Sequence, residues 1–396
     1  MIKTVKFVNF KSLSPQTVRL GRLNVLIGAN ASGKSNFVDA FRFIQDCLAD
    51  GISGAVARRF GWRNTLARRL SARGRIRLEL GLDSAGVREV RIDRRVSYKP
   101  DDMSYVLELA YAKEEPYVRK ERFAVTWRSA RKRLSEHFER DRASVRAWGP
   151  GESEPRTIAF GDYARDRVLL EAPLPMLSTF LLSVVIRGWR FYELDVRAAR
   201  MPSAWDTEDI LMGDGRNLSR VLESIGKKGN RRLYDRLCKL MGILVPGFVS
   251  WRTEHQSNDT IVFNIQEKGV TEPFPPSAIS DGTVRLLAIL LAVLHQPRRA
   301  GLICIDEPER CVHPQILKTL VEVIREASEQ TQIIVTTHSA QLVRWLKPSE
   351  ALLVDKKGNQ TMIARAQDVK HIDKFLEEFS LDELWLSGYL EGGTAL

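Results

Sequence analysis

The stretch Gly28-Ala-Asn-Ala-Ser-Gly-Lys34-Ser35 fits the pattern GxxxxGK[ST] at every required position. Residues 23–27, Leu-Asn-Val-Leu-Ile, precede it as a short apolar strand. Apolar residues then recur at helical spacing up to Gly51, where we expect the helix to end. Strand, glycine-rich turn and helix form the context in which this pattern binds phosphate. The alternative is an accidental glycine-rich turn, and both flanks argue against it.

The predicted loop gives a role to each of its polar groups. Its backbone N–H groups and the N-terminus of the following helix would surround the phosphates of a nucleoside triphosphate. Lys34 would neutralise the β and γ oxygens, and the Ser35 hydroxyl would hold Mg²⁺. The residues expected to contact the nucleotide here are Gly28, Asn30, Ala31, Ser32, Gly33, Lys34, Ser35 and Asn36.

Composition bounds the classes of protein to which the chain can belong. Its 396 residues, 44% of them hydrophobic, suffice for two or three ordinary domains or for one large domain with insertions. The longest purely apolar run, residues 286–294, is far short of the roughly 20 residues that a membrane span needs. The N-terminus lacks the layout of a signal peptide. We expect reduced thiols of a cytoplasmic protein, with disulfides left open, because no CxxC spacing joins Cys47, Cys238, Cys304 and Cys311.

The net charge of +12 favours an anionic partner such as nucleic acid. Its distribution is more informative than its sum. Every charged side chain between Ile52 and Leu78 is an arginine, and a second basic cluster runs from Arg119 to Arg146. We expect these two stretches to contact nucleic-acid phosphates, which requires no reading of bases. Solvated surfaces, or long stems covering apolar area, are the alternative.

A second apolar strand ends in two acids. Residues 301–308 read Gly-Leu-Ile-Cys-Ile-Asp-Glu-Pro, and in a P-loop protein such a strand carries the carboxylates that serve the bound phosphates. We expect Asp306 to hold Mg²⁺ and Glu307 to be the base that orients the attacking water. Without the P-loop, the same pattern would be interpreted as a charged loop end.

Two further motifs follow the same logic. Residues 332–339 predict a buried strand ending in His338, which a parallel sheet would bring to the edge where the phosphates bind. We expect a catalytic role for His338, with a structural role as the alternative. Residues 279–283, Ile-Ser-Asp-Gly-Thr, precede an apolar helix. Ser280 and Gly282 could form a second anion site at its N-terminus, and an ordinary helix cap explains them equally well.

Together these motifs resemble those of the ABC-type ATPase heads of the RecF/SMC class. More narrowly, the chain is similar to stand-alone AAA-domain ATP-binding proteins related to OLD nucleases and to PtuA-like ATPases of bacterial phage defence. The resemblance covers about residues 1–50 and 180–396. The segments that carry it are Asn-Phe-Lys-Ser-Leu at 9–13, Ser-Asp-Gly-Thr at 280–283, Glu-Pro-Glu-Arg-Cys-Val-His-Pro at 307–314, Thr-His-Ser at 337–339 and a C-terminal segment at 381–388.

The resemblance implies a head that is complete only as a homodimer, or as a higher oligomer built from one. ATP bound with Mg²⁺ at Lys34 and Ser35 of one copy would be closed over by the signature of the other copy. Hydrolysis at Glu307, with His338 as the switch histidine, would then release the two copies. The signature residues implied are Ser280, Asp281, Gly282 and Thr283, with Asp281 where transporters carry a glycine.

Two departures from the family pattern matter. No glutamine between Ser35 and Ser280 fits the family's Q-loop, because Gln45 lies in the first predicted helix and Gln256 and Gln266 come late. The 58 residues after His338 are too few for the Toprim nuclease domain of OLD proteins. Any nuclease would therefore act in trans.

The expected fold is α/β, an ABC-type P-loop ATPase head with a mixed sheet, an antiparallel meander, a helical lobe and no long coiled coil. We divide the chain into residues 1–112, the first part of the head with the P-loop; residues 113–178, a basic insertion; and residues 179–396. The last part would carry the signature, the Asp-Glu strand and the switch histidine.

Three functions stay open at this point. The first is an ATP-driven dimeric switch of a bacterial anti-phage system, which senses double-stranded DNA, RNA or a phage component and controls a separate nuclease or toxin. The second is a RecF-like ATPase of DNA repair or recombination. The third is a scaffold that binds ATP for assembly and hydrolyses little of it. A transporter motor fits least, and we expect no membrane partner.

Overall fold

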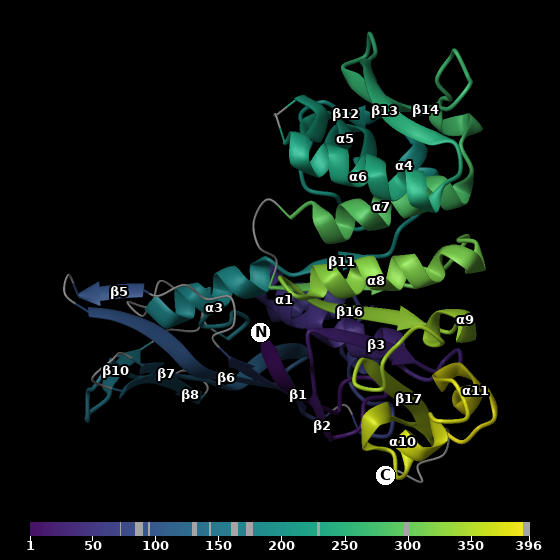
Figure 1. Ribbon diagram of the computed structural model, residues 1–396. Coiled ribbons are helices and arrows are strands. Elements are labelled where there is room, and N and C mark those ends of the chain that lie inside the picture. The colour runs from purple at the N-terminus through teal and green to yellow at the C-terminus, as the bar shows by residue number, and fades with distance from the viewer. Residues whose placement is uncertain are drawn as a thin grey trace. The chain divides into compact units, whose positions relative to one another are not determined.

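The computed structural model describes residues 1–71, 73–83, 90–93, 96–128, 133–141, 144–159, 165–171, 177–227, 230–296 and 301–390. Its internal contacts divide the chain into two compact units, and both units mix strands with helices (Figure 1). Unit 1 comprises Met1–Trp189, Ser349–Asp373 and Gly388–Leu396, and unit 2 comprises Arg190–Pro348 and Lys374–Ser387.

The larger sheet of unit 1 is an antiparallel meander, as the alternating sequence patterns predicted. The order of its described strands is β10-β9-β8-β7-β6-β4-β1-β2, with β5 paired to β6 at the side. Alternate residues of β4 are buried because one face of the sheet packs on the core. The strands are β1 (Ile2–Val8), β2 (Thr17–Arg19), β4 (Ile76–Asp83), β5 (Val90–Asp93), β6 (Val96–Ala112), β7 (Glu115–Arg128), β8 (Arg133–Asp141), β9 (Ser144–Trp148) and β10 (Arg156–Ala159).

A second group of strands in unit 1 carries the phosphate-binding motif. Strand β3 (Leu23–Ile27) pairs in parallel with β17 (Ala351–Lys357), which pairs antiparallel with β18 (Gln360–Arg365). All five residues of β3 are buried. Helix α1 (Lys34–Ala57) follows β3, and Phe37 and Phe41 of α1 pack against the Phe7 ring of β1. The other helices of unit 1 are α2 (Trp62–Thr65), α3 (Leu177–Arg187) and the 3-10 turn η4 (Ala366–Asp368).

Helix α1 does not end at Gly51, where the sequence analysis placed its end. It breaks there, with Gly51 at φ 76°, and then resumes as far as Ala57. The reason lies more than a hundred residues away, because the Asp166 carboxylate accepts hydrogen bonds from the backbone N–H (2.7 Å) and the hydroxyl (2.6 Å) of Ser53. Asp166 therefore caps the resumed part of the helix.

Unit 2 contains a parallel group of strands and a small antiparallel sheet. Strand β15 (Leu302–Asp306) lies between β11 (Arg190–Tyr192) and β16 (Gln332–Thr337), parallel to both. Helix α8 (Leu317–Ser328), after the turn η3 (Pro314–Ile316), connects β15 to β16. In the small sheet, β14 (Thr260–Glu267) pairs with β12 (Ser203–Ala204) and β13 (Phe248–His255). The remaining elements are α4 (Val196–Arg200), α5 (Leu218–Lys227), α6 (Arg231–Leu244), η2 (Pro276–Ala278), α7 (Asp281–Leu294), α9 (Ala340–Val343) and α11 (Leu381–Leu386), with α10 (Ile372–Phe375) spanning a boundary between the units.

The predicted fold class is confirmed. Strands and helices alternate around buried apolar strands, and the longest helix among the described residues, α1, has 24 residues and is broken at Gly51. No helix in the described ranges is long and apolar enough to cross a membrane. The three-part division of the chain stays a prediction. Strands β7 to β10, which lie within residues 113–178, belong to the same sheet as β1 and β4.

Candidate nucleotide site

The predicted phosphate-binding loop is a tight turn between β3 and α1. The Lys34 ammonium curls back over it and donates hydrogen bonds to the carbonyl oxygens of Gly28 (2.7 Å) and Ala29 (2.9 Å). Lys34 is also the first residue of α1, so the N–H groups of the first helical turn point toward the loop. A buried cation next to the N–H groups of a helix N-terminus is the arrangement that binds an anion.

Both loop glycines are required by close packing. A Cβ on Gly28 would lie 2.2 Å from the Val354 carbonyl oxygen, and a Cβ on Gly33 would lie 2.0 Å from Thr361 Oγ1. Gly33 also has φ 110°, a backbone conformation that other residues rarely adopt. The loop and the β17–β18 pair therefore fit together only because these positions lack side chains.

The loop also contains a buried hydroxyl group whose hydrogen-bonding capacity is unused. Within the described residues, Ser32 Oγ is buried and has no hydrogen-bond partner. An unpaired buried polar atom is unfavourable, and a bound phosphate oxygen would satisfy it. The residues of the loop thus fit a triphosphate.

Thr361 of β18 fastens the loop from the other end of the chain. Its hydroxyl donates to the Ser32 carbonyl (2.8 Å) and lies 2.7 Å from Ser12 Oγ, which accepts from Asn36 Nδ2 (2.7 Å). Because a hydroxyl donates one proton, the Thr361 proton is used on Ser32, and Ser12 must donate to Thr361. We call Asn36, Ser12, Thr361 and the Ser32 carbonyl the Thr361 relay. The motif search missed Thr361, since nothing near it in sequence points to the loop.

A cavity of about 480 Å³ adjoins the start of α1. Four of its lining side chains are basic and none is acidic, and Leu66 and Ala67 give it an apolar part. Lys11 also forms an ion pair with Asp39 at 2.7 Å. The lining residues are Lys11, Ser12, Asn36, Asn64, Leu66, Ala67, Arg68, Arg69, Lys356 and Asn359. Apart from Asn36, the sequence analysis proposed none of them as a nucleotide contact.

In unit 2, the predicted hydrolytic residues meet at the ends of β15 and β16. Glu307 Oε1 lies 2.8 Å from His338 Nδ1, and the Asp306 carboxylate accepts a hydrogen bond from the Thr336 hydroxyl. Glu307 has φ 43°, which is strained for a residue with a side chain, and its N–H donates to the Thr336 carbonyl at 3.1 Å. Strain of this kind persists where the surroundings hold it, and it concentrates at functional sites.

Arg285 of α7 fixes the backbone next to this carboxylate. Its guanidinium donates to the carbonyl oxygens of Glu307 (2.8 Å), Asp306 (3.2 Å) and Leu194 (2.9 Å). Burial lowers the pKa of Arg285, with nearby charges opposing one another. A buried cation bonded to neutral carbonyls thus connects the predicted signature helix to the predicted base.

A second carboxylate, Glu309, orders the turn after β16. Thr337 Oγ1 donates to Glu309 Oε1 at 2.6 Å and accepts from the Ser339 N–H at 3.0 Å. Burial raises the pKa of Glu309 above its ordinary value, against the lowering effect of the Thr337 hydrogen bond. This contact holds the residues on either side of His338 in place.

The predicted signature residues cap helix α7. Ser280 Oγ accepts from the Thr283 N–H at 3.2 Å, and Asp281 forms an ion pair with Arg200 at 2.7 Å. A Cβ on Gly282 would lie 2.5 Å from the Cys311 carbonyl oxygen, so the motif packs directly on the loop after Glu307. The cap geometry fits both interpretations of the motif, an ordinary helix start and a surface that offers N–H groups to an anion.

The structure therefore brings the predicted residues together as two groups, the P-loop residues in unit 1 and the Asp306, Glu307 and His338 group in unit 2. The Gln45 side-chain amide donates to the carbonyls of Ile186 (2.8 Å) and Trp189 (3.0 Å) and so ties α1 to the end of α3. The glutamine of the family's Q-loop stays unassigned.

Comparison with known protein families gives one match. Residues 23–344 match the family described as "AAA domain, putative AbiEii toxin, Type IV TA system". The matched region begins at β3 and extends beyond His338, so it includes every motif described above except the segments at 9–13 and 381–388. The chain belongs to this family. No curated protein matches the chain.

Solved structures show the fold that this AAA-domain family member shares. A crystal structure of an SMC head bound to the C-terminal winged-helix domain of ScpA has a TM-score of 0.56 at 15% identity, covering 92% of this chain and 97% of that one. An SMC head from Thermotoga maritima has a TM-score of 0.45 at 14% identity, covering 92% and 98%. A Pyrococcus furiosus SMC head with an extended coiled coil, bound to the C-terminal domain of ScpA, has a TM-score of 0.47 at 12% identity, covering 95% and 99%. The first likeness confirms the fold that the motifs indicated, that of an ABC-type P-loop ATPase head.

Proposed function

We propose that the protein binds and hydrolyses ATP, and that this cycle switches it between an open and a closed dimer. The observation that carries the proposal is the pair of Glu307 and His338, 2.8 Å apart beside Asp306. A protein that only binds nucleotide needs no positioned carboxylate, whereas hydrolysis needs a group that orients water. The strained backbone of Glu307, held by Arg285, supports the same conclusion.

Each residue then has a distinct role. Lys34 and the N–H groups of residues 28–36 bind the phosphates, and Ser32 Oγ gains the partner that it lacks within the described residues. Mg²⁺, held by Ser35 and Asp306, would neutralise phosphate charge. Glu307 accepts the proton of the attacking water, and the contact of His338 with Glu307 orients that carboxylate.

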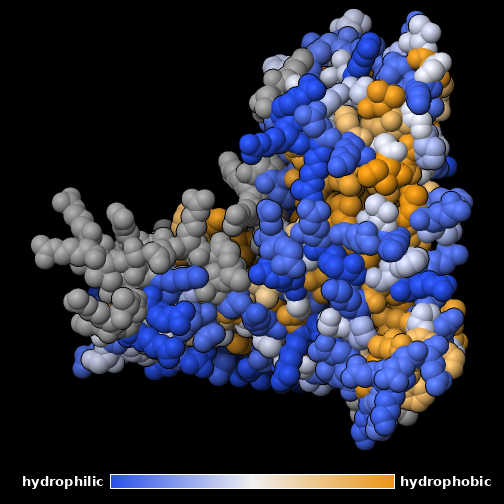
Figure 2. Space-filling view, viewed as in Figure 1, coloured by the Kyte–Doolittle hydropathy of each residue, from blue (hydrophilic) through white to orange (hydrophobic). Residues whose placement is uncertain are grey.

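The closed dimer would use the cap of α7 as its second contact with ATP. The N–H groups of Asp281 and Gly282, which precede the Thr283 N–H bonded to Ser280, would suit a phosphate bound to another copy. Exposed apolar side chains support a partner surface here, since Met201 follows Arg200, the partner of Asp281, and is 61% exposed. In the view of Figure 2, hydrophobic residues gather over the part of unit 2 that holds α4 and α7.

The biological role that fits best is the sensor ATPase of an anti-phage system with a separate nuclease or toxin as effector. Membership of a family described by a toxin–antitoxin system supports it. Double-stranded DNA or RNA is the trigger suggested by the basic stretch from 52 to 78. A RecF-like role in DNA repair is the second candidate, favoured by the likeness to an SMC head. That SMC head was crystallised with a domain of ScpA, so a protein partner fits either role.

Two variants test the ATPase. Lys34→Ala should abolish ATP binding, because the phosphates lose their buried cation. Glu307→Gln should bind ATP with unchanged affinity, hydrolyse it at least a hundredfold more slowly and accumulate as a dimer, an effect on the order expected for loss of a general base. Binding is measured by calorimetry, turnover by phosphate release and dimerisation by light scattering. Undiminished ATP affinity in the first variant, or normal turnover in the second, would refute these roles.

A further inference from the structure

Phe60, just after α1, has a side-chain exposure and a backbone conformation that are both unfavourable for an aromatic residue. Its side chain is 91% exposed, so it contributes almost nothing to the core. Its backbone has φ 58°, where a residue with a Cβ is strained and where glycine usually ends a helix. The following residue is Gly61, yet the aromatic residue occupies the first left-handed position. Exposure and strain together indicate a residue kept for contact with something else.

The turn that carries Phe60 is rigidly held. The Phe60 N–H donates to the Ala57 carbonyl (2.9 Å), and its own carbonyl accepts from Asn64 Nδ2 (2.8 Å). Gly61 is fixed in the same way, since its N–H donates to Val56 and its carbonyl accepts from Thr65 Oγ1 at 3.0 Å. The backbone on both sides of the ring is thus tied to α1 and α2.

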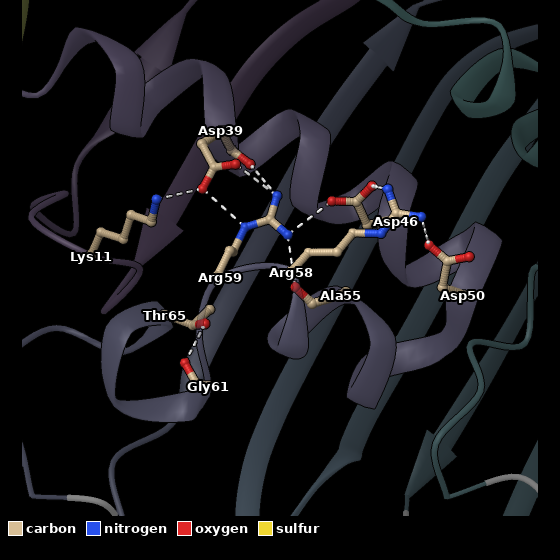
Figure 3. A network of polar contacts seen from close by, with 9 residues as sticks. All are labelled: Lys11, Asp39, Asp46, Asp50, Ala55, Arg58, Arg59, Gly61 and Thr65. Carbon is tan, nitrogen blue, oxygen red and sulfur yellow. Dashed lines mark hydrogen bonds and ion pairs between the residues drawn. The ribbon is translucent and has the colours of Figure 1, made fainter.

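The residue before Phe60 anchors the turn to the core (Figure 3). The Arg59 guanidinium binds both carboxylate oxygens of Asp39 (2.7 and 2.9 Å), and also Asp46 (2.9 Å) and the Ala55 carbonyl (2.8 Å). Arg59 itself is 7% exposed and its guanidinium carbon lies 4.8 Å from the Phe43 ring centre. Burial alone would raise the pKa of Asp39, but Arg59 and Lys11 lower it below its ordinary value. The carboxylate is therefore ionised and the anchor persists at neutral pH.

Only cations surround this exposed ring in the sequence. Between Ile52 and Leu78 all charged residues are arginines, and Arg58 is 60% exposed although it pairs with Asp46 and Asp50. Arg68 and Arg69 line the basic cavity together with Asn64, the residue that holds the Phe60 carbonyl. An exposed aromatic side chain flanked in sequence by several cations complements a ligand with flat apolar faces and a negative backbone. Nucleic acid has both features.

The geometry also selects the form of the nucleic acid. A ring on a rigid turn stacks only on a base whose face is open, and in a duplex neighbouring bases cover those faces except at the ends. We propose that Phe60 stacks on an unpaired base of a single strand or a frayed end, while Arg58, Arg63 and Arg68 contact its phosphates. This rests on the nucleic-acid trigger of the proposed function, but it assigns the contact at Phe60 to unpaired strands and frayed ends rather than to the body of a duplex.

The test measures nucleic-acid binding by the full chain without nucleotide, so that it does not depend on ATP hydrolysis. The probes are a fluorescent 20-mer of deoxythymidine and a blunt duplex of equal length, followed by anisotropy. Phe60→Gly suits the left-handed backbone and should fold at least as well as the natural protein. We expect its affinity for the single strand to fall by roughly 5- to 150-fold, with little change for the duplex, the size of effect that one stacked base contributes. Phe60→Trp should retain binding, and Phe180→Ala, at another exposed phenylalanine, should not alter it.

The salt dependence separates stacking from charge. Phe60→Gly should leave the slope of log affinity against log salt unchanged, whereas Arg68→Ala should reduce it by about one. Equal affinity of Phe60→Gly and the natural protein for the single strand would overturn the proposal, and so would an equal loss for single strand and duplex. A change in oligomeric state of Phe60→Gly without a change in binding would assign the ring to a second copy instead. The Lys34 and Glu307 variants decide the ATPase separately.

Discussion

Replacing Thr361 with valine tests whether the end of the chain holds the phosphate-binding loop. The substitution keeps the shape of a side chain that is 1% exposed and removes its hydroxyl. Two hydrogen bonds are lost, to the Ser32 carbonyl at 2.8 Å and to the Ser12 hydroxyl at 2.7 Å. At about 1 kcal/mol each, plus about 1–2 kcal/mol for the carbonyl left without a donor, the loss is about 3–4 kcal/mol.

The loss should appear in both stability and nucleotide binding. The free energy of unfolding in urea should fall by an amount in this range. If the loop detaches without global unfolding, ATP affinity should fall by up to roughly 100- to 1,000-fold, since each 1.4 kcal/mol is tenfold. Calorimetric titration with ATP measures the second effect. Thr361→Ser is the matched control, because it keeps both hydrogen bonds and removes only the methyl group.

A double-mutant cycle with Ser12→Ala separates the relay from a simple loss of packing. If Ser12 donates to Thr361, the two substitutions should cost less together than the sum of their separate effects. Additive losses would mean that the two hydroxyls act independently. Natural stability and natural ATP affinity in Thr361→Val would refute the reasoning that the relay fixes the loop.

Two other substitutions have equally definite outcomes. Gly282→Ala should lower the free energy of unfolding by about 1–3 kcal/mol, because its Cβ would meet the Cys311 carbonyl oxygen at 2.5 Å. Gly226→Ala is the control and should not be destabilising, because no atom lies within 4 Å of its Cβ. Equal free energies of unfolding for the two variants in urea would contradict the packing argument. Burial raises the pKa of Glu121 from 4.5 to about 7, against the lowering hydrogen bond from Leu169 N–H and the charge of Arg140. Between these two pH values the folded state keeps a proton that the unfolded state releases, so the free energy of unfolding falls by about 3 kcal/mol as pH rises from 4.5 to 7. Glu121→Gln should remove this part of the pH dependence of stability. A pH profile that the substitution leaves unchanged would show that Glu121 is ionised throughout.

The motifs that lie at strand ends could be predicted because local sequence determines them. Lys34 follows an apolar strand and a glycine turn, and Glu307 and His338 each follow an apolar strand. The apolar runs and the turn residues that end them were therefore enough to locate all three. Their meeting across β15 and β16 followed from the rule that parallel strands end at one edge. The fold class was accessible for the same reason.

The contacts that stabilise these motifs could not be predicted, because they join distant segments. Thr361 lies more than three hundred residues from Ser32, and Asp166 more than a hundred from Gly51, and no periodic pattern links either pair. Arg59 was interpreted as part of a basic surface, yet it is buried between two acids. One sequence signal pointed to this burial. Asp39 and Asp46 are about two helical turns apart on α1, so both lie on one face of the helix, and Arg59 binds that face.

The Thr361 relay has a consequence for the order in which the protein is made. The glycine loop leaves the ribosome early, but its fastening hydroxyl is more than three hundred residues behind, which at typical rates of synthesis is a delay of roughly 20–60 s. During that time the loop lacks the donor that fixes the Ser32 carbonyl. A nascent chain, or a fragment cut before β18, should therefore be unable to retain ATP. Occupancy of the nucleotide site would report that synthesis has passed residue 361.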